Sequence, residues 1–179
     1  MRIGVDIDDV LFEFVSPFLE WQKSNVKLED ITQWDMSSVL NLEESELVRR
    51  VNLFNKSDEF KNLPPVMYAY DVLWYMKNLS IMFYAITHRP KDTKEVTCNS
   101  LEKHYPNIFE DVFFRDNEKV DIARDKDLYA HIDDGVHNFR GFDKLKTKPI
   151  VYDRPWNRWC KDYSRAKDWI EVKKNILKY

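Results

Sequence analysis

The chain opens with the sequence RIGVDIDDVLF at residues 2–12, where a short apolar run leads into a group of acidic side chains. Residues 2–7 predict a buried β-strand, because apolar side chains dominate them. Residues 10–21 follow with apolar positions at helical spacing, which predicts a helix. A strand that passes into a helix through polar residues is the repeating unit of α/β folds.

Strands and helices alternate from residue 81 to the end of the chain. The apolar runs predict strands at 81–86, 111–114, 128–132 and 149–152. The stretches between and after them predict helices at 92–104, 117–124, 136–145 and 166–177, with Asp116 as a candidate cap for the second of these. The alternation indicates an α/β domain with a mostly parallel sheet, and we expect a three-layer Rossmann-like core.

The segment between the first two predicted strands has a different character. Residues 23–63 are acidic, and short helical pieces alternate there with Asp, Asn and Ser. The pair Pro64-Pro65 then suits the start of a helix that reaches Asn78. We therefore expect a small helical cap at 23–63, inserted after the first strand. The core would comprise residues 1–22 and 64–179.

The composition is that of a globular domain with a sizeable core. The chain has 179 residues, of which 44% are hydrophobic and 15% aromatic. This length is typical of a single domain. Its 28 Lys and Arg residues against 31 Asp and Glu residues give a net charge of −3. A protein that binds nucleic acid stably through positive charge is therefore not expected.

The scarcity of glycine excludes several nucleotide-binding and catalytic motifs. The only glycines are Gly4, Gly135 and Gly141, too few for a Walker loop, a dinucleotide-binding fingerprint or a Gly-x-Ser-x-Gly elbow. The four histidines form no His-Glu-x-x-His motif. Cys98 and Cys160 lie too far apart for a Cys-x-x-Cys zinc site.

The cysteines and the lack of recognisable targeting signals set an expectation for location. Two isolated cysteines without a secretory signal peptide are typical of a cytoplasmic protein with free thiols. No apolar run approaches the length that spans a bilayer, so we expect no membrane association.

Acidic side chains follow two predicted strands, at the edge where ligands bind in parallel sheets. Asp6 and Asp8 follow the first strand, and Asp133 and Asp134 follow the strand at 128–132. Residues two apart in a strand share a face, so Asp6 and Asp8 can converge on one point. Their repulsion favours a bound cation, and Mg²⁺ suits carboxylates, waters and a substrate phosphate. The alternative is that these acids only cap the following helices and turns.

A hydroxyl and an ammonium group complete the candidate site. Thr87 follows the second predicted strand and is next to His88 and Arg89, while Lys119 opens a helix and Lys126 is a competing lysine. Phosphoryl transfer needs a nucleophile, a proton donor for the leaving oxygen and positive charge around the phosphate. A carboxylate can act as the nucleophile by forming an aspartyl phosphate. These residue types therefore favour a phosphatase.

Four segments resemble, in the same order, the four motifs of haloacid-dehalogenase-like hydrolases. They are DIDDVL at residues 6–11, the strand end at Thr87, Lys119, and Ile132-Asp133-Asp134. More narrowly, the chain is similar to the 5′(3′)-deoxyribonucleotidase family, also called cytosolic type C nucleotidases. Further matching features are Phe14, Lys91 after Thr87-His88-Arg89-Pro90, and the closing segment Arg154-Pro155-Trp156-Asn157 with the helix around Trp169. The resemblance covers nearly the whole chain.

The resemblance implies catalytic and phosphate-binding roles for individual residues. It implies that Asp6 attacks the phosphorus and becomes an aspartyl phosphate. It implies that Asp8 protonates the leaving alkoxide and then helps to activate water. Thr87 is expected to hydrogen-bond a phosphate oxygen, and Lys119 and Lys91 are expected to neutralise the phosphate and the nucleophile.

The resemblance also implies a metal site. Mg²⁺ is expected to be held by Asp6, by the backbone carbonyl of Asp8 and by the pair Asp133-Asp134. Either member of that pair can be the direct ligand.

The implied substrate is a small nucleotide, a deoxyribonucleoside monophosphate. Phe14 is expected to stack on its base or sugar, with Trp34 or Phe54 from the inserted segment as further candidates. An aromatic residue in such a segment is more often part of its core than a platform for a base. The resemblance leaves a homodimer open.

Three positions depart from the family pattern. Asp9 stands where the family usually has a glycine that allows a tight turn, so we expect a different backbone or charge balance there. His88 replaces a small hydroxyl residue, so a phosphate contact is either lost or supplied by His88 or Arg89. Asn117-Glu118 stands ahead of Lys119 where an arginine is sometimes found. We expect these changes to affect rate and substrate range rather than reaction class.

Other functions remain open at this point. A phosphatase of the same fold could act on a sugar phosphate, another small phosphomonoester or a polynucleotide 3′-phosphate, although the near-neutral charge disfavours the last. A signalling receiver domain also places paired acids, a threonine and a lysine around Mg²⁺, but in a different order and without an inserted cap. A catalytically dead binding module would lack Asp6 or Asp8, and both are present.

Overall fold

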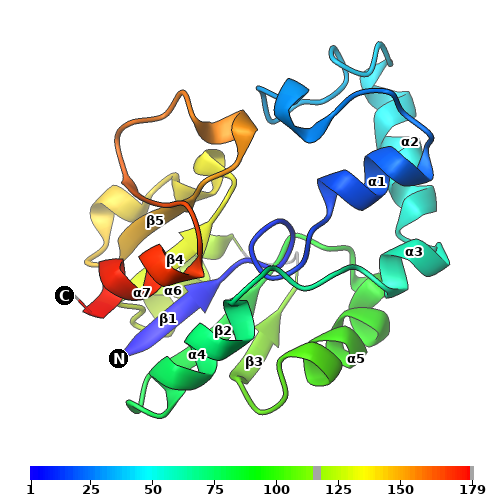
Figure 1. Cartoon of the computed structure of the whole chain (residues 1–179). Coiled ribbons are helices and arrows are strands. Elements are labelled where there is room, and N and C mark those ends of the chain that lie inside the picture. Colours follow the sequence, from blue (N-terminus) through cyan, green and yellow to red (C-terminus); the bar gives the residue numbers. More distant parts are fainter. Residues whose placement is uncertain (115–117, 178–179) are drawn as a thin grey trace.

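The computed structural model describes residues 1–114 and 118–177 (Figure 1). The expected cap residue Asp116 therefore lies outside the described residues. The helix that it was expected to cap is α6 (Lys119–Asp125), with Glu118 at its N-cap position.

A six-stranded parallel sheet forms the centre of the molecule, in the order β3-β2-β1-β4-β5-β6. Its strands are β1 (Arg2–Val5), β2 (Met82–Ile86), β3 (Phe109–Phe113), β4 (Ala130–Asp133), β5 (Lys148–Tyr152) and β6 (Ser164–Ala166). The predicted α/β class is confirmed. β6 was not predicted, because a three-residue strand is too short for a periodic signal.

β1 lies in the middle of the sheet, between β2 and β4. Ile3 pairs with Phe83 of β2 on one side and with Ala130 of β4 on the other. The strand order reverses between β1 and β4, because the chain adds β2 and β3 on one side and returns to add β4 on the other. Ligands of parallel sheets bind at the carboxyl ends of the strands next to such a reversal. Asp6 follows β1 and Asp133 ends β4, so the fold brings the predicted acids to this edge.

Helical segments cover both faces of the sheet and give three layers (Figure 1). One face carries α4 (Ala69–Lys77), α5 (Lys94–His104) and α7 (Trp169–Leu177). The other carries α6 and the 3₁₀ turns η3 (Val136–Phe139) and η4 (Phe142–Lys144). A separate buried apolar cluster fills each interface. Within the described part of the chain, no helix has the length and apolar character needed to cross a membrane.

The loop after β1 replaces the first half of the helix expected at 10–21. The observed helix α1 spans only Val15–Trp21. Before it, the N–H of Asp9 donates to the carbonyl of Phe12 at 2.6 Å, and Asp9 has a φ of 55°. Phe12 also forms an isolated β-bridge with Pro65, so the backbone there is paired with a distant segment and does not continue as a helix. The apolar side chains that suggested a helix therefore belong to a loop, and they pack into the core from it.

Backbone interruptions also change other expected helices. The helix expected at 64–78 is α4 and begins only at Ala69, after Pro65 takes part in an isolated β-bridge. The stretch expected as one helix at 136–145 consists of η3 and η4. Gly141 separates these turns with a φ of 85°, a conformation that ends helices. The expected start of α7 was early because Ala166 belongs to β6.

The inserted segment at 23–63 folds as short helical pieces beside α1 (Figure 1). They are η1 (Leu28–Asp30), α2 (Glu44–Phe54) and α3 (Asp58–Lys61). Leu47, Phe54 and Phe60 of this segment belong to the same apolar cluster as the sheet. The segment is therefore packed continuously on the rest of the molecule, and its behaviour as a separate cap stays a prediction.

Candidate active site

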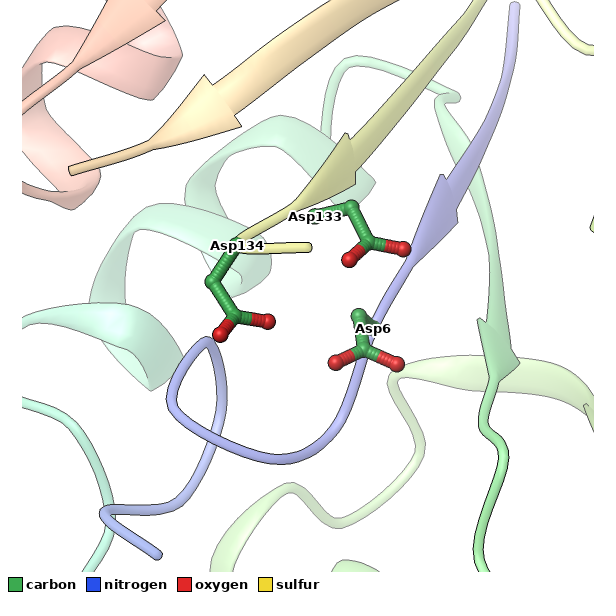
Figure 2. A group of neighbouring side chains, drawn as sticks. All are labelled: Asp6, Asp133 and Asp134. Carbon is green, nitrogen blue, oxygen red and sulfur yellow. The ribbon is translucent and has the colours of Figure 1, made fainter. Parts of the chain in front are cut away.

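Three buried carboxyl groups meet at the carboxyl edge of the sheet. Asp6 follows β1, Asp133 is the last residue of β4, and Asp134 comes next. One oxygen from each lies within 4.8 Å of the other two. Figure 2 shows the three groups turned toward a common space. The structure thus brings together three of the four acids selected from the sequence.

One lysine joins two of these carboxylates. The Nζ atom of Lys119 donates to Oδ1 of Asp6 at 2.5 Å and to Oδ2 of Asp133 at 2.7 Å. Lys119 is buried, and it is in place because it opens α6 under this edge of the sheet. The competing candidate Lys126 lies instead over one aromatic ring of β2 and one of β3, at 5.5 and 5.2 Å. The structure therefore places Lys119 at the carboxylate cluster.

Asp133 is saturated with hydrogen-bond partners. Its Oδ1 accepts from the N–H of Gly135 at 2.8 Å and from Nδ2 of Asn138 at 2.9 Å. Its Oδ2 accepts from Lys119 and lies 3.0 Å from Nε2 of His131. Burial alone would raise the pKa of Asp133, but the charge of Lys119 and the hydrogen bonds with His131 and Lys119 hold that pKa well below its usual range. Asp133 is therefore an ionised partner of Lys119.

The other two acids, Asp6 and Asp134, have raised pKa values. It raises the pKa of Asp6 to about 7, although the ammonium of Lys119 opposes the shift. Burial and the charges of Asp6 and Asp133 raise the pKa of Asp134 well above its usual range. One ammonium does not balance three buried carboxylates. A hard divalent cation prefers oxygen ligands and supplies the missing positive charge, so this donor set fits such an ion.

The free energy of unfolding should depend on pH because of this charge imbalance. The ordinary pKa of an aspartate carboxyl is 3.8, and burial raises the pKa of Asp6 to about 7 in the folded protein. Between these values the folded state keeps a proton that the unfolded state has lost. The free energy of unfolding of metal-free protein should therefore fall as the pH rises from about 4 to about 7, and then level off.

Urea unfolding of chelator-treated protein across this pH range measures the effect. Excess Mg²⁺ should reduce the decline, because it binds the ionised carboxylates of the folded state. The Asp6→Asn variant should show a shallower decline without metal. Stability that rises with pH over this range would contradict the assignment.

A tryptophan from the closing segment orients Asp134. The 3₁₀ turn η5 (Pro155–Asn157) follows β5. Its Trp156 donates Nε1–H to Oδ2 of Asp134 at 2.9 Å, and Asn157 donates Nδ2–H to the backbone carbonyl of Asp134 at 2.9 Å. Both ends of Asp134 are thus held by one turn, which fixes the direction of its carboxylate.

Removing the indole N–H should weaken metal binding. We expect Trp156→Phe to lower the affinity for Mg²⁺ by about 10-fold, because partners that orient a metal-binding carboxylate contribute this much. Calorimetric titration of metal-free protein at fixed pH measures the change. Trp159→Phe is the matched control, since its exposed indole donates only to the carbonyl of Trp156, at 3.0 Å. Equal weakening in both variants would contradict a specific role for Trp156.

The carboxylate of Asp8 is bound by an arginine and is not part of the acidic cluster. Its Oδ1 accepts from Nη2 of Arg89 at 2.6 Å, and both residues line a cavity that also includes Asp6 and Asp134. Among the described residues, the clustered carboxylates are those of Asp6, Asp133 and Asp134 only. A metal contact through the backbone carbonyl of Asp8 stays a prediction.

The residues selected after β2 differ in burial and in whether they line this cavity. Thr87 is buried and its Oγ1 accepts the N–H of Arg89 at 3.1 Å, which leaves its hydroxyl hydrogen to donate. Thr87 and the exposed His88 both line the cavity. Lys91 opens the 3₁₀ turn η2 (Lys91–Thr93), is exposed and does not line this cavity. Its phosphate-binding role stays a prediction.

A cavity of about 740 Å³ connects the cluster with aromatic side chains. Its lining includes Asp6 and Lys119 together with Phe14 and Trp34. This volume is in the range of small-molecule sites. The indole of Trp34 is 53% exposed, so it is accessible from the cavity. Phe54, the third aromatic candidate, is fully buried and contacts Phe14 from behind, with ring centroids 5.4 Å apart.

Asp9 keeps the tight turn for which a glycine was expected. Its φ of 55° is left-handed, and aspartate tolerates this region better than most residues. Its carboxylate accepts the N–H groups of Phe14 at 3.1 Å and Val15 at 3.2 Å, which have no partner within the first turn of α1. Its carbonyl accepts Nε of Arg154 at 2.8 Å. Burial raises the pKa of Asp9 to about 7, although Arg154 opposes the shift.

Sequence reasoning missed the roles of two residues. Trp156 follows β5, so a search of every strand end for polar groups would have reached it. Arg89 was left between a surface residue and a phosphate contact. It is buried against Asp8, which lies 81 positions away in the chain. No local pattern indicates that contact.

Known proteins that are similar to this chain in sequence are named as nucleotidases, which agrees with a site suited to binding phosphate. The chain matches, over residues 1–179, the profile of the family described as 5′ nucleotidase, deoxy (pyrimidine), cytosolic type C protein. A protein of Oceanobacillus iheyensis named as a candidate nucleotidase is 27% identical over 187 residues, covering 99% of this chain and 100% of the relative. The 5′(3′)-deoxyribonucleotidase of Bacillus subtilis is 24% identical over 183 residues, covering 98% of each chain.

Solved structures show the same fold. A haloacid-dehalogenase family hydrolase from Deinococcus radiodurans with bound phosphate and sodium has a TM-score of 0.68 at 11% identity, covering 99% of this chain and 95% of that one. A magnesium-bound hydrolase of the same superfamily from Bacillus subtilis has a TM-score of 0.63 at 13% identity, covering 99% and 98%. Because the profile spans the whole sequence, the chain belongs to the cytosolic type C 5′-nucleotidase family and is a hydrolase of phosphomonoesters.

Proposed function

We propose that this protein is a Mg²⁺-dependent phosphatase that hydrolyses deoxyribonucleoside monophosphates through an aspartyl phosphate on Asp6. The observation that carries the proposal is the cavity that places Asp6 and Lys119 together with Phe14 and Trp34. A phosphate fits the charged residues, and a base or sugar fits the aromatic ones. The deoxyribonucleotidase names of the relatives from Bacillus subtilis and its phage SPbeta support this substrate class.

The first half of the reaction transfers the phosphoryl group to the protein. A carboxylate oxygen of Asp6 forms a bond to phosphorus while the bond from phosphorus to the sugar oxygen breaks. Asp8 gives a proton to that leaving oxygen, so the nucleoside departs as a neutral alcohol. Lys119 holds Asp6 at 2.5 Å, which orients the nucleophile, and Thr87 has a hydroxyl hydrogen to donate to a phosphate oxygen.

The second half restores the protein. A water molecule attacks the phosphorus of the aspartyl phosphate, and the bond between phosphorus and the Asp6 oxygen breaks. Asp8, ionised after the first half, accepts the proton of that water. Inorganic phosphate leaves, and Asp6 is again a carboxylate beside Lys119.

Asp6 and Asp134 are the proposed direct metal ligands. Asp133 is engaged on both oxygens by four neighbouring groups, whereas the indole of Trp156 engages one oxygen of Asp134. Asp133 therefore serves the site by holding Lys119. When bound there, Mg²⁺ supplies the positive charge that draws a phosphate dianion into an acidic pocket.

The remaining parts of the proposal follow from the same site. Residues 23–63 act as a small cap, since Trp34 and α2 contribute to the cavity lining. The substrate is a free nucleotide in the cytoplasm, as the family description suggests. The net charge of −3 supports a small substrate over a nucleic acid.

A phosphate-release panel tests the proposal. It contains dUMP, dTMP, dCMP, dAMP, dGMP, the ribonucleotides, 3′-dUMP, several sugar phosphates and a 3′-phosphorylated oligonucleotide, each with Mg²⁺ and with chelator. Metal-dependent release from deoxynucleotides, with the highest kcat/KM in the panel, is the expected result. Preference for a sugar phosphate or the oligonucleotide would overturn the substrate and keep the reaction class. Release that persists in chelator would overturn the metal dependence.

A further inference from the structure

A buried arginine, Arg89, forms a salt bridge with the candidate acid Asp8. Arg89 is only 5% exposed, and a buried guanidinium needs close partners. Its Nε lies 3.1 Å from each carboxylate oxygen of Asp8, and its Nη2 lies 2.6 Å from Oδ1. Its Nη1 donates to Oγ1 of Thr97 at 3.0 Å. All three guanidinium nitrogens are therefore committed to protein atoms.

Two other elements hold the guanidinium independently of Asp8. Thr97 lies within α5 and is completely buried. The ring of Phe60, from α3, lies under the guanidinium, with its centroid 4.6 Å from Cζ of Arg89, a distance at which a cation is attracted to the ring face. The guanidinium is thus fixed from the core and from the inserted segment, so it can set the position of Asp8.

The contact treats the two oxygens of Asp8 differently. Oδ1 accepts hydrogen bonds from both Nη2 and Nε of Arg89, whereas Oδ2 accepts one from Nε alone. A proton on Oδ2 is compatible with this arrangement, because the donors of Arg89 still meet an acceptor at Oδ1. Oδ2 is therefore the oxygen of Asp8 that has fewer contacts with Arg89.

We infer that Arg89 is a positioning residue for proton transfer: it anchors Oδ1 of Asp8 and leaves Oδ2 to carry the proton to the leaving oxygen. The inference rests on the proposed role of Asp8 as the acid. Positioning matters because a general acid works only within hydrogen-bond reach of the atom that it protonates. Direct binding of the substrate phosphate by Arg89 is the competing role.

The leaving group separates these two roles. Nucleosides and glycerol leave as alkoxides that need a proton, whereas 4-nitrophenolate leaves without one. The phosphoryl group is the same in all three substrates, so a lost phosphate contact would affect them equally. The ratio kcat/KM includes only the steps up to departure of the leaving group, so hydrolysis of the aspartyl phosphate does not enter it.

The first variant is Arg89→Lys, which keeps the charge and loses the planar fork. Its kcat/KM should fall by about 10²-fold for dUMP and glycerol 3-phosphate, but by less than about 3-fold for 4-nitrophenyl phosphate. Each protein is measured at its own pH optimum, and thermal unfolding checks that the variant is folded.

A matched pair at Thr97 keeps Arg89 itself intact. Thr97 contacts Arg89 and does not line the cavity. Thr97→Val keeps the shape of the side chain and removes the acceptor of Nη1, whereas Thr97→Ser keeps the acceptor. We expect Thr97→Val to show the same selective loss on alkyl phosphates, by about 10-fold, and Thr97→Ser to remain close to wild type.

Equal losses on alkyl and aryl phosphates would overturn the inference in favour of phosphate binding, and unchanged rates would overturn it outright.

If wild-type protein hydrolyses glycerol 3-phosphate but not dUMP, the proposed substrate fails while the Arg89 comparison still decides the inference. If wild-type protein hydrolyses none of these substrates, nitrogen-15 NMR tests whether Arg89 is bound to Asp8 in solution. A slowly exchanging Nε–H signal of Arg89 that Asp8→Asn abolishes supports it, and a rapidly exchanging signal overturns it.

Discussion

Replacing Asp6 with asparagine is expected to abolish phosphate release, with kcat lowered by at least about 10⁴-fold, the scale seen when a catalytic nucleophile is removed. An amide cannot form the acyl phosphate on which the proposed reaction depends. It also removes one of the two carboxylate partners of Lys119, which lies 2.5 Å from Asp6. The variant tests the nucleophile without a large change of shape.

The variant should remain folded, so that lost activity reflects chemistry. Burial already raises the pKa of Asp6 to about 7, so a neutral side chain suits this position. Phosphate release with Mg²⁺ and the trapping of labelled phosphate on the protein are the measurements. Asp71→Asn, at an exposed aspartate of α4, is the control and should behave as wild type. Labelled phosphate still attached to the Asp6→Asn protein would place the nucleophile elsewhere.

Replacing Lys119 with methionine should damage both activity and stability. The ammonium lies 2.5 Å from Asp6 and 2.7 Å from Asp133, and all three side chains are buried. Its loss leaves buried carboxylates without their cation, which costs about 3–5 kcal/mol of unfolding free energy when one partner of a buried pair is removed. We also expect kcat to fall by about 10²–10³-fold, because the positive charge next to the proposed nucleophile Asp6 is lost.

Urea unfolding with and without Mg²⁺ separates the two effects. Added Mg²⁺ should recover part of the stability of Lys119→Met, because it supplies positive charge to the same carboxylates. It should not recover the rate. Lys126→Met is the matched control, since that ammonium lies over aromatic rings of the neighbouring strands. A Lys119→Met protein as stable as the control in chelator would contradict the buried charge balance described here.

The acidic site shows why part of this protein could be predicted from its sequence. Asp6, Asp133 and Asp134 were selected because each follows an apolar strand in an alternating pattern of strands and helices. In a parallel sheet the carboxyl ends of all strands lie on one edge, so local periodicity alone places such residues near one another. The order of the motif residues then indicated the family, which the profile over residues 1–179 bears out.

Local periodicity was a poorer guide where the backbone turns. The helix expected at 10–21 loses its first turns to a loop in which Phe12 pairs with Pro65 in an isolated β-bridge. Gly141 likewise divides the helix expected at 136–145. β6 escaped prediction because three residues carry no period. In the two expected helices most of the apolar side chains are still buried, and tertiary contacts decide the backbone that buries them.

The sequence by itself determined the α/β class, the parallel sheet and the acids, threonine and lysine at its carboxyl edge, because these depend on short-range patterns. Only the tertiary structure decided how the acids are held. It paired Asp8 with Arg89, 81 positions away, and Asp134 with Trp156, 22 positions away. Such pairs depend on how distant segments fold against one another and on which buried group lacks a partner, and neither property is written in the local order of residues.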